Sequence, residues 1–220
     1  MRTVATATDP WPLLRKQASP QGRRALHLVV HGRSGGVIPD CLIELAETLA
    51  RLRSAPVQLD ALTAECELSS MSRAAWLIPL FLLPGSHVRH DIPSIRRTLR
   101  DRGEMVTSLP FLGGWPLWWD LVREDLRGQG NPASTALLHH PLRPGVANRF
   151  LAALSQRLGC PVMAFDCWMA QCSTDRFRPY PLVLAPNRMT DALEASDDST
   201  TLLERPRLHE GLIDLLAALP

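Results

Sequence analysis

Hydrophobic positions along the chain alternate between short apolar runs and segments with helical spacing. Residues 25–30 (ALHLVV) form an apolar run that predicts a buried strand. Within residues 39–53, apolar side chains recur every three or four positions, as on one face of an amphipathic helix. Continued to residue 126, this pattern predicts strands at 25–30, 56–62, 76–83 and 105–109, and helices at 39–53, 92–102 and 116–126.

The pattern begins again after a Gly- and Pro-containing linker at residues 128–132. The expected elements are strands at 135–138 and 181–186, a short strand reached through residues 160–162, and helices at 146–158 and 209–219. Residues 181–186 (PLVLAP) also match residues 79–84 (PLFLLP) in register. The similarity indicates an internal repeat of roughly 105 residues. We therefore divide the chain into a lead-in at 1–24, a first lobe at 25–128 and a second lobe at 129–220.

Strands alternating with helices at this spacing predict α/β architecture with parallel strands. Two copies of that pattern predict two similar lobes, each flavodoxin-like or Rossmann-like, with helices flanking each sheet and a cleft between the lobes. In such sheets, ligands bind beyond the carboxyl ends of the strands. Candidate functional residues are therefore sought where apolar runs end in polar segments.

Composition excludes several classes of function. Of the 220 residues, 45% are hydrophobic and 21% charged, and the net charge of +2 is too small to favour nucleic acid or an anionic membrane as a partner. No run reaches the roughly 18 apolar residues of a membrane span, and no secretory signal is evident. The five cysteines form no CxxC pair, which favours reduced thiols. The sequence thus indicates a cytoplasmic protein.

Two histidines follow predicted strand ends in the first lobe. His31 comes directly after the strand at 25–30, and His87 follows the strand at 76–83 within the segment Pro84-Gly85-Ser86-His87. Because parallel strands end at one edge of a sheet, both imidazoles are expected to face the same site. Two imidazoles can bind a divalent ion such as Co²⁺, Fe²⁺ or Ni²⁺, or accept protons near neutral pH. His90 is a secondary candidate, and Asp91 is expected to cap the helix that follows.

The remaining motifs narrow the chemistry. The loop at residues 31–36 (HGRSGG) is neither a GxGxxG nor a P-loop sequence and lacks the lysine, so no nucleotide site is expected. Trp115, Trp118 and Trp119 cluster at one predicted helix; we expect them to be core, with a stacking platform for a macrocycle as the alternative. In the second lobe, Met189 takes the place of His87, whereas His139 keeps the position of His31 and is a further secondary candidate. The two lobes are therefore chemically unequal.

Three segments resemble the class II chelatases of tetrapyrrole biosynthesis, specifically the sirohydrochlorin chelatases of the CbiX/SirB type. The segment VVHGRSGG resembles that family's strand and His-Gly loop. The segment PLFLLPGSHVRHDIP is similar to its strand followed by Gly-x-His and Asp-Ile-Pro, and LPFLGGWPLWWDLV resembles its segment before a closing helix. The resemblance covers the first lobe throughout and the second lobe weakly.

The resemblance implies a function and roles for individual residues. It implies ATP-independent insertion of Co²⁺ or Fe²⁺ into sirohydrochlorin, for cobalamin or siroheme biosynthesis, with His31 and His87 binding the metal and helping to remove pyrrole protons. The family's glutamate past the second strand has no direct counterpart: Thr63 falls nearest, and Glu65 is the candidate acidic partner. Candidate substrate-binding residues are Arg33, Arg89, Gly85 and Ser86.

Two further functional classes remain open from the sequence. A tetrapyrrole- or metal-binding protein without catalytic activity would keep the chelatase scaffold while lacking the family glutamate. An unrelated flavodoxin-like binding module would lack a shared site for His31 and His87. Sequence leaves the metal, the macrocycle and the choice between monomer and homodimer open.

Overall fold

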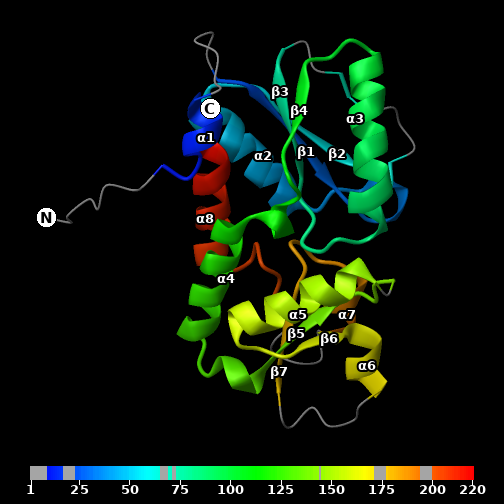
Figure 1. Cartoon of the computed structure of the whole chain (residues 1–220), viewed down its shortest axis with the longest axis vertical. Helices are drawn as coiled ribbons and strands as arrows, with labels where there is room; N and C mark the ends of the chain where they lie inside the picture. The colour runs from blue at the N-terminus through cyan, green and yellow to red at the C-terminus, as the bar shows by residue number, and fades with distance from the viewer. Residues whose placement is uncertain are drawn as a thin grey trace, which may run out of the picture.

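Two parallel β-sheets, one in each lobe, form the framework of the fold (Figure 1). The computed structural model describes residues 9–16, 23–64, 69–70, 73–143, 145–170, 177–193 and 200–220. In the first lobe the strand order is β2-β1-β3-β4, and in the second it is β6-β5-β7. The strands are β1 Ala25–Val30, β2 Val57–Ala61, β3 Ala75–Pro79, β4 Val106–Ser108, β5 Thr135–His139, β6 Val162–Ala164 and β7 Arg178–Pro181. The predicted α/β class with parallel sheets flanked by helices is confirmed.

Helices cover both faces of the first sheet. Trp76 and Ile78 of β3 point into a core shared with α2, whereas Leu77 between them packs on the opposite face with α3, as the period of two along a strand requires. The α-helices are α1 Pro12–Lys16, α2 Asp40–Arg53, α3 Ile92–Asp101, α4 Pro116–Gly128, α5 Val146–Leu158, α6 Phe165–Ala170, α7 Arg188–Leu193 and α8 Pro206–Ala217. Helices α1, α6 and α7 were not predicted from the sequence pattern.

Two strand predictions are wrong in their extent, because each of these strands ends at a proline. The strand expected at 76–83 is β3, which ends at Pro79, and the strand expected at 181–186 is β7, which ends at Pro181. Beyond each proline the chain remains buried and keeps one backbone hydrogen bond to the neighbouring strand. Leu80 donates its N–H to Val29 O, and Leu182 donates its N–H to Leu138 O, each at 2.8 Å. The repeated bond shows that the two lobes share one local design.

Helices α4 and α8 join the two lobes. Helix α8 comes from the end of the chain, yet it packs against α2 of the first lobe and against α4 (Figure 1). Helix α4 in turn contacts α5 of the second lobe. One cluster of buried side chains consequently runs through both lobes, from Leu28 of β1 to Tyr180 of β7. Trp115, Trp118 and Trp119 belong to this core, as the sequence predicted.

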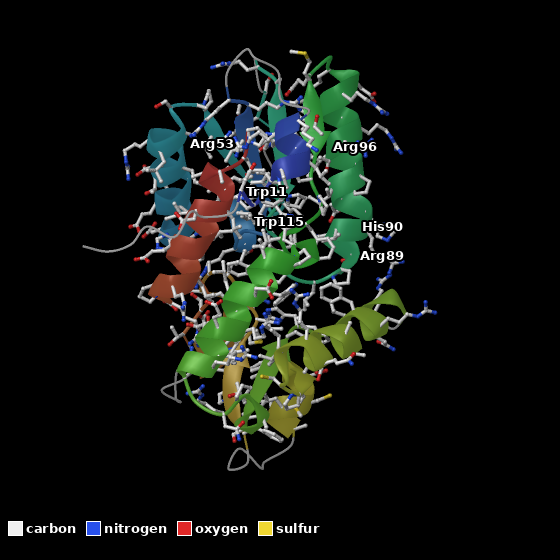
Figure 2. All side chains as sticks on the ribbon, turned by 60° about the vertical axis from the view of Figure 1, so that its left-hand side comes forward. Trp11, Arg53, Arg89, His90, Arg96 and Trp115 are labelled. Carbon is white, nitrogen blue, oxygen red and sulfur yellow. The ribbon has the colours of Figure 1, made fainter. Side chains whose placement is uncertain are left out.

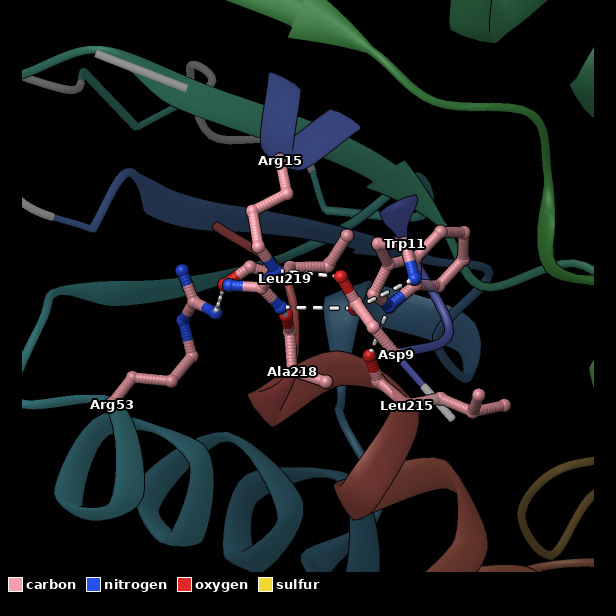
Figure 3. Close-up of polar contacts among 7 residues, drawn as sticks. All are labelled: Asp9, Trp11, Arg15, Arg53, Leu215, Ala218 and Leu219. Carbon is pink, nitrogen blue, oxygen red and sulfur yellow. Dashed lines mark hydrogen bonds and ion pairs between the residues drawn. The ribbon is translucent and has the colours of Figure 1, made fainter. Parts of the chain in front are cut away.

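The lead-in is anchored by Trp11. Its indole Nε1–H donates to Leu215 O at 2.7 Å, and its ring meets that of Trp115 edge to face at a centroid distance of 4.8 Å. Arg15 of α1 donates to Ala218 O at 2.8 Å, so residues near both ends of the described chain meet beside α2 (Figure 3).

Two expectations from the sequence concern membrane-spanning helices and the state of the cysteines. Among the described residues, no helix has both the length and the apolar character needed to cross a membrane. Cys41, Cys160 and Cys167 are free thiols, in line with the predicted reduced cysteines, while Cys66 and Cys172 lie outside the described residues.

Candidate functional site

The two predicted histidines lie side by side. His31 follows β1, and His87 opens a π-helical turn, His87–Asp91, that leads into α3. Their imidazole centroids are 4.7 Å apart and their planes meet at 73°. β1 and β3 are parallel neighbours, with Val29 opposite Pro79. The segments that carry His31 and His87 therefore both leave the sheet at the carboxyl ends of its strands. The structure thus brings together the residues that the sequence singled out.

Hydrogen bonds define which nitrogen of each ring is available. His31 Nδ1 lies 2.7 Å from Gly32 O, and His87 Nδ1 lies 2.6 Å from a carboxylate oxygen of Asp91. Both partners are acceptors, so each Nδ1 carries the proton and donates it. Each neutral ring then keeps a lone pair on Nε2, the atom with which such histidines bind a metal.

The role expected for Asp91 is wrong. It was expected to be the N-cap of the following helix, but its side chain forms no capping bond and its backbone is already helical. Its carboxylate instead accepts the bond from His87, four residues earlier in the π-helical turn. Asp91 therefore orients the imidazole of His87 and balances the positive charge that the ring acquires when it takes up a proton.

Thr63 fixes the loop that carries His31. Its hydroxyl lies 3.1 Å from His31 O and 2.6 Å from Arg33 O. Gly32 sits beside it with φ +77°, and a Cβ at that position would lie 2.6 Å from both Ala61 Cβ and Thr63 Oγ1. Only glycine suits this place, since φ is positive and no space remains. Thr63, which falls nearest the family's glutamate position, thus supports the loop. Glu65 lies outside the described residues.

Arg33 reaches into the second lobe. Its Nε donates to Pro186 O at 3.2 Å, and its guanidinium lies 3.5 Å from the carboxylate of Asp191. The side chain predicted to meet substrate carboxylates is therefore engaged between the lobes. Gly85 also faces the second lobe, because a Cβ there would touch Leu142 at 3.4 Å.

Other candidates from the α3 side are exposed. Ser86, Arg89 and His90 are all open to solvent, and Figure 2 shows Arg89 and His90 at the lower end of α3. Phe81 stacks on His87 at a centroid distance of 5.9 Å and limits the positions that the ring can take. Arg89 remains a candidate for substrate contact, whereas neither His90 nor Ser86 forms part of the histidine pair.

In the second lobe, His140 rather than His139 faces solvent. His139 is 5% exposed, and its Nδ1 is bonded to His140 O at 2.6 Å. His140 is exposed and lies near Asn187, with 3.3 Å between its Nε2 and the amide nitrogen. Partial withdrawal from water, together with the nearby rings of His31 and His139, lowers the pKa of His140. The secondary candidate from the sequence, His139, is thus the buried member of this pair, because it is the last residue of β5 and its side chain points into the lobe.

The equivalent of His87 in the second lobe is core. Met189 is fully buried with Ala136, Leu138 and Trp168, and its N–H is capped by the side chain of Asn187. The predicted chemical difference between the lobes therefore has a basis in packing. The position that His87 holds in the first lobe is taken in the second by a buried core residue, Met189.

The site offers a divalent ion few protein ligands. Among the described residues, no group of three or more His, Cys, Asp or Glu side chains is arranged to hold a metal ion. For a bound ion, the Nε2 atoms of His31 and His87 would supply two positions and leave the remaining positions to water or incoming nitrogen atoms. Such partial coordination suits an ion that must be passed on.

Comparison with known proteins identifies the fold. CbiX, described as the terminal enzyme for biosynthesis of siroheme in denitrifying bacteria, superimposes with a TM-score of 0.57 at 22% identity, over 90% of this chain and 100% of CbiX. The cobalt complex of the sirohydrochlorin chelatase SirB from Bacillus subtilis subspecies spizizenii gives 0.55 at 18% identity, over 88% and 94%.

A third similar structure is a larger protein. DR2241 from Deinococcus radiodurans, a multi-domain protein with structural similarity to chelatases, gives a TM-score of 0.56 at 19% identity. The match covers 89% of this chain and 55% of DR2241, so the chain spans about half of that protein. No family model matches the sequence, and neither does any curated protein. The resemblance expected from the sequence is confirmed at the level of the fold: this chain has the fold of the sirohydrochlorin chelatases.

Proposed function

We propose that this protein is a sirohydrochlorin chelatase that inserts Co²⁺ or Fe²⁺ into the macrocycle without ATP. The observation that carries the proposal is the pair of adjacent imidazoles, His31 and His87, whose Nδ1 atoms are both bonded elsewhere. The chelatase fold and the cobalt-bound SirB and Fe³⁺-bound SirB structures support a metal as substrate. The tetrapyrrole would be the second substrate, with the protein acting as a monomer or homodimer.

The reaction exchanges one divalent ion for two pyrrole protons. On this proposal the Nε2 atoms of His31 and His87 hold the partly hydrated ion beside the ring. As the ring nitrogens replace them on the metal, each imidazole becomes free to accept a proton. Asp91 stabilises the resulting charge on His87 through the bond to Nδ1. Deprotonation and metal entry are thereby coupled, and the protonated imidazoles then release their protons to water.

The test is an anaerobic mixture of sirohydrochlorin, Co²⁺ and protein, followed by absorption spectroscopy. We expect repeated turnover faster than spontaneous insertion, and loss of that excess rate in His87→Ala. The matched control is His90→Ala, because His90 is exposed outside the pair. Equal rates of metal insertion with and without the unmodified protein would refute the proposal that it is an enzyme.

A second candidate is a non-catalytic tetrapyrrole- or metal-binding protein on the same scaffold. The observation in its favour is that Thr63 occupies the place nearest the expected glutamate and bonds the loop instead. The same assay separates the two candidates. Binding of Co²⁺ or macrocycle without turnover would favour this second candidate.

A further inference from the structure

A groove with three arginines lies beside α3. It has a volume of about 410 Å³ and is bounded by α3 on one side and the chain after β4 on the other. Arg96, Arg97 and Arg100 line it from α3, while Ile92 and Phe111 contribute apolar surface. No Asp or Glu is among its lining residues. We call this feature the α3 groove.

The three guanidiniums carry uncompensated charge. All are exposed, and within the part of the chain that the structure describes none of them forms an ion pair. Some other arginines do have an acidic partner: Arg123 and Arg157 both contact the carboxylate of Asp120 at 2.8 Å. A concave surface bearing only positive charge attracts anions, and arginine pairs with carboxylates in a bidentate manner.

One end of the α3 groove is lined by residues that are close along the chain to the histidine pair. Its lining includes Val88, one residue after His87, and Pro79 at the end of β3. Side chains of a helix lean toward its N-terminus, so Arg96 and Arg97 lean toward the end of α3 that carries His87. Arg96 lies nine residues beyond His87, roughly 13 Å along the helix axis, and Figure 2 shows it higher on α3 than Arg89 and His90. A tetrapyrrole ring with extended carboxylate side chains, met by an extended arginine side chain, is long enough to bridge this distance from His87 to Arg96.

We propose that the α3 groove is a subsite for the carboxylate arms of the macrocycle, with Arg96 and Arg97 as the residues that bind them. The inference rests on the proposed function and names where its acidic substrate is held. Apolar lining at Val88 and Phe111 suits the edge of a planar ring, and the arginines beyond suit its acids. Closeness to His87 favours the macrocycle over an acidic peptide, since a peptide gains nothing from the metal-binding pair.

The experiment measures macrocycle binding separately from insertion. Sirohydrochlorin is titrated without metal into the unmodified protein, the double variant Arg96→Gln/Arg97→Gln and a control, with tryptophan fluorescence as the signal. The control is Arg51→Gln/Arg127→Gln, which removes the same charge from exposed positions on α2 and α4. We expect the groove variant to bind roughly tenfold more weakly, as for two lost charge pairs, and to lose most of the salt dependence of binding. The control should bind as the unmodified protein does.

Each outcome decides one statement. Equal binding by the groove variant and the control overturns the α3 groove as a subsite, even where the unmodified protein inserts metal. Weaker binding by the groove variant alone supports it, even where no insertion occurs and the proposed enzyme fails. Failure of the unmodified protein to bind sirohydrochlorin overturns both. A polyglutamate peptide that binds the groove while sirohydrochlorin binding stays unchanged would assign the groove to an acidic protein partner and overturn the proposal.

Discussion

The hydrogen bond between Asp91 and His87 fixes the orientation of the His87 imidazole. The carboxylate lies 2.6 Å from Nδ1, so Nε2 points away from it, toward the metal position of the proposed reaction. Asp91→Asn keeps the size of the side chain but removes its charge. We expect affinity for Co²⁺ to fall by about tenfold, as for other partners of metal-binding histidines, measured by isothermal titration calorimetry. Asp101→Asn, at the far end of α3, is the control, and an equal loss in both variants would contradict the assignment.

A second His–Asp pair, within the first sheet, supports the fold. His27 is fully buried and bonds Asp60 through Nε2 at 2.7 Å, while Ser69 donates to the same carboxylate. Burial alone would raise the pKa of Asp60, but the bonds from His27 and Ser69 outweigh it and lower that pKa.

The lowered pKa of Asp60 makes part of the stability dependent on pH. The ionised carboxylate stabilises the folded state above its unfolded pKa, about 3.9, and this contribution is lost as pH falls through the lower folded value. We therefore expect Asp60→Asn to reduce the free energy of unfolding by about 2 kcal/mol at neutral pH and by less at pH values near 3. Urea denaturation at both pH values measures this difference. Asp214→Asn, on the exposed side of α8, should show no such dependence.

Single residues were predictable where their place along a strand decided their position. His31 and His87 follow parallel neighbouring strands, so strand order alone brings them together. The roles of Asp91 and Arg33 were not predictable. The first depends on a π-helical turn, and the second on contacts with Pro186 and Asp191 in the other lobe. Neither local propensity nor periodicity contains that information.

At the level of elements, the π-helical turn at His87–Asp91 sets the direction of the site histidine. Ile92 N–H bonds to His87 O, five residues back, so the turn holds one residue more than an α-helical turn. The helix predicted from the sequence instead begins at residue 92. Apolar spacing located α3 correctly from Ile92 to Leu99, but it could not reveal an inserted residue upstream, because the extra residue leaves that spacing unchanged.

Removing the inserted residue should uncouple the site from the fold. Deletion of His90 converts the turn to α-helical spacing and rotates His87 by about 100° around the helix axis relative to α3. We expect loss of detectable Co²⁺ binding and insertion, with the melting temperature changed by only a few degrees, because Ile92, Ile95 and Leu99 keep their packing. His90→Ala is the control, since it removes the side chain but not the residue. Retained binding in the deletion variant would show that the turn does not orient His87.

For the whole molecule, the internal repeat predicted two lobes but not how they are fastened together. The repeat aligns the helix near residues 209–219 with the Trp-rich helix at 116–126, and both are present as α8 and α4. Their packing against each other and against α2 joins the lobes through one core. Periodicity shows which face of a helix is apolar, but it does not identify the partner that covers the face. The arrangement of lobes therefore had to come from the structure.

Arg53 holds the end of α8 in the first lobe. It is 3% exposed, and its guanidinium donates to the carbonyl oxygens of Leu216, Ala217, Leu219 and Arg24. Figure 3 shows the bond to Leu219. These oxygens include the unpaired carbonyls at a helix end, where a cation is favourable. Burial, with a smaller contribution from Arg23, lowers the pKa of Arg53 to about 10, so the side chain stays charged at neutral pH.

Replacing this contact should weaken both lobes. In Arg53→Met the carbonyl oxygens lose their donors within a buried site, and we expect the free energy of unfolding to fall by about 3 kcal/mol. Because the core is continuous from Leu28 to Tyr180, backbone hydrogen exchange should accelerate in β5 of the second lobe as well as in β1. Mass spectrometry of exchange in both strands measures this coupling, with Arg51→Gln, an exposed change on α2, as the control. Faster exchange confined to β1 would mean that the lobes unfold independently and that α8 belongs energetically to the first lobe alone.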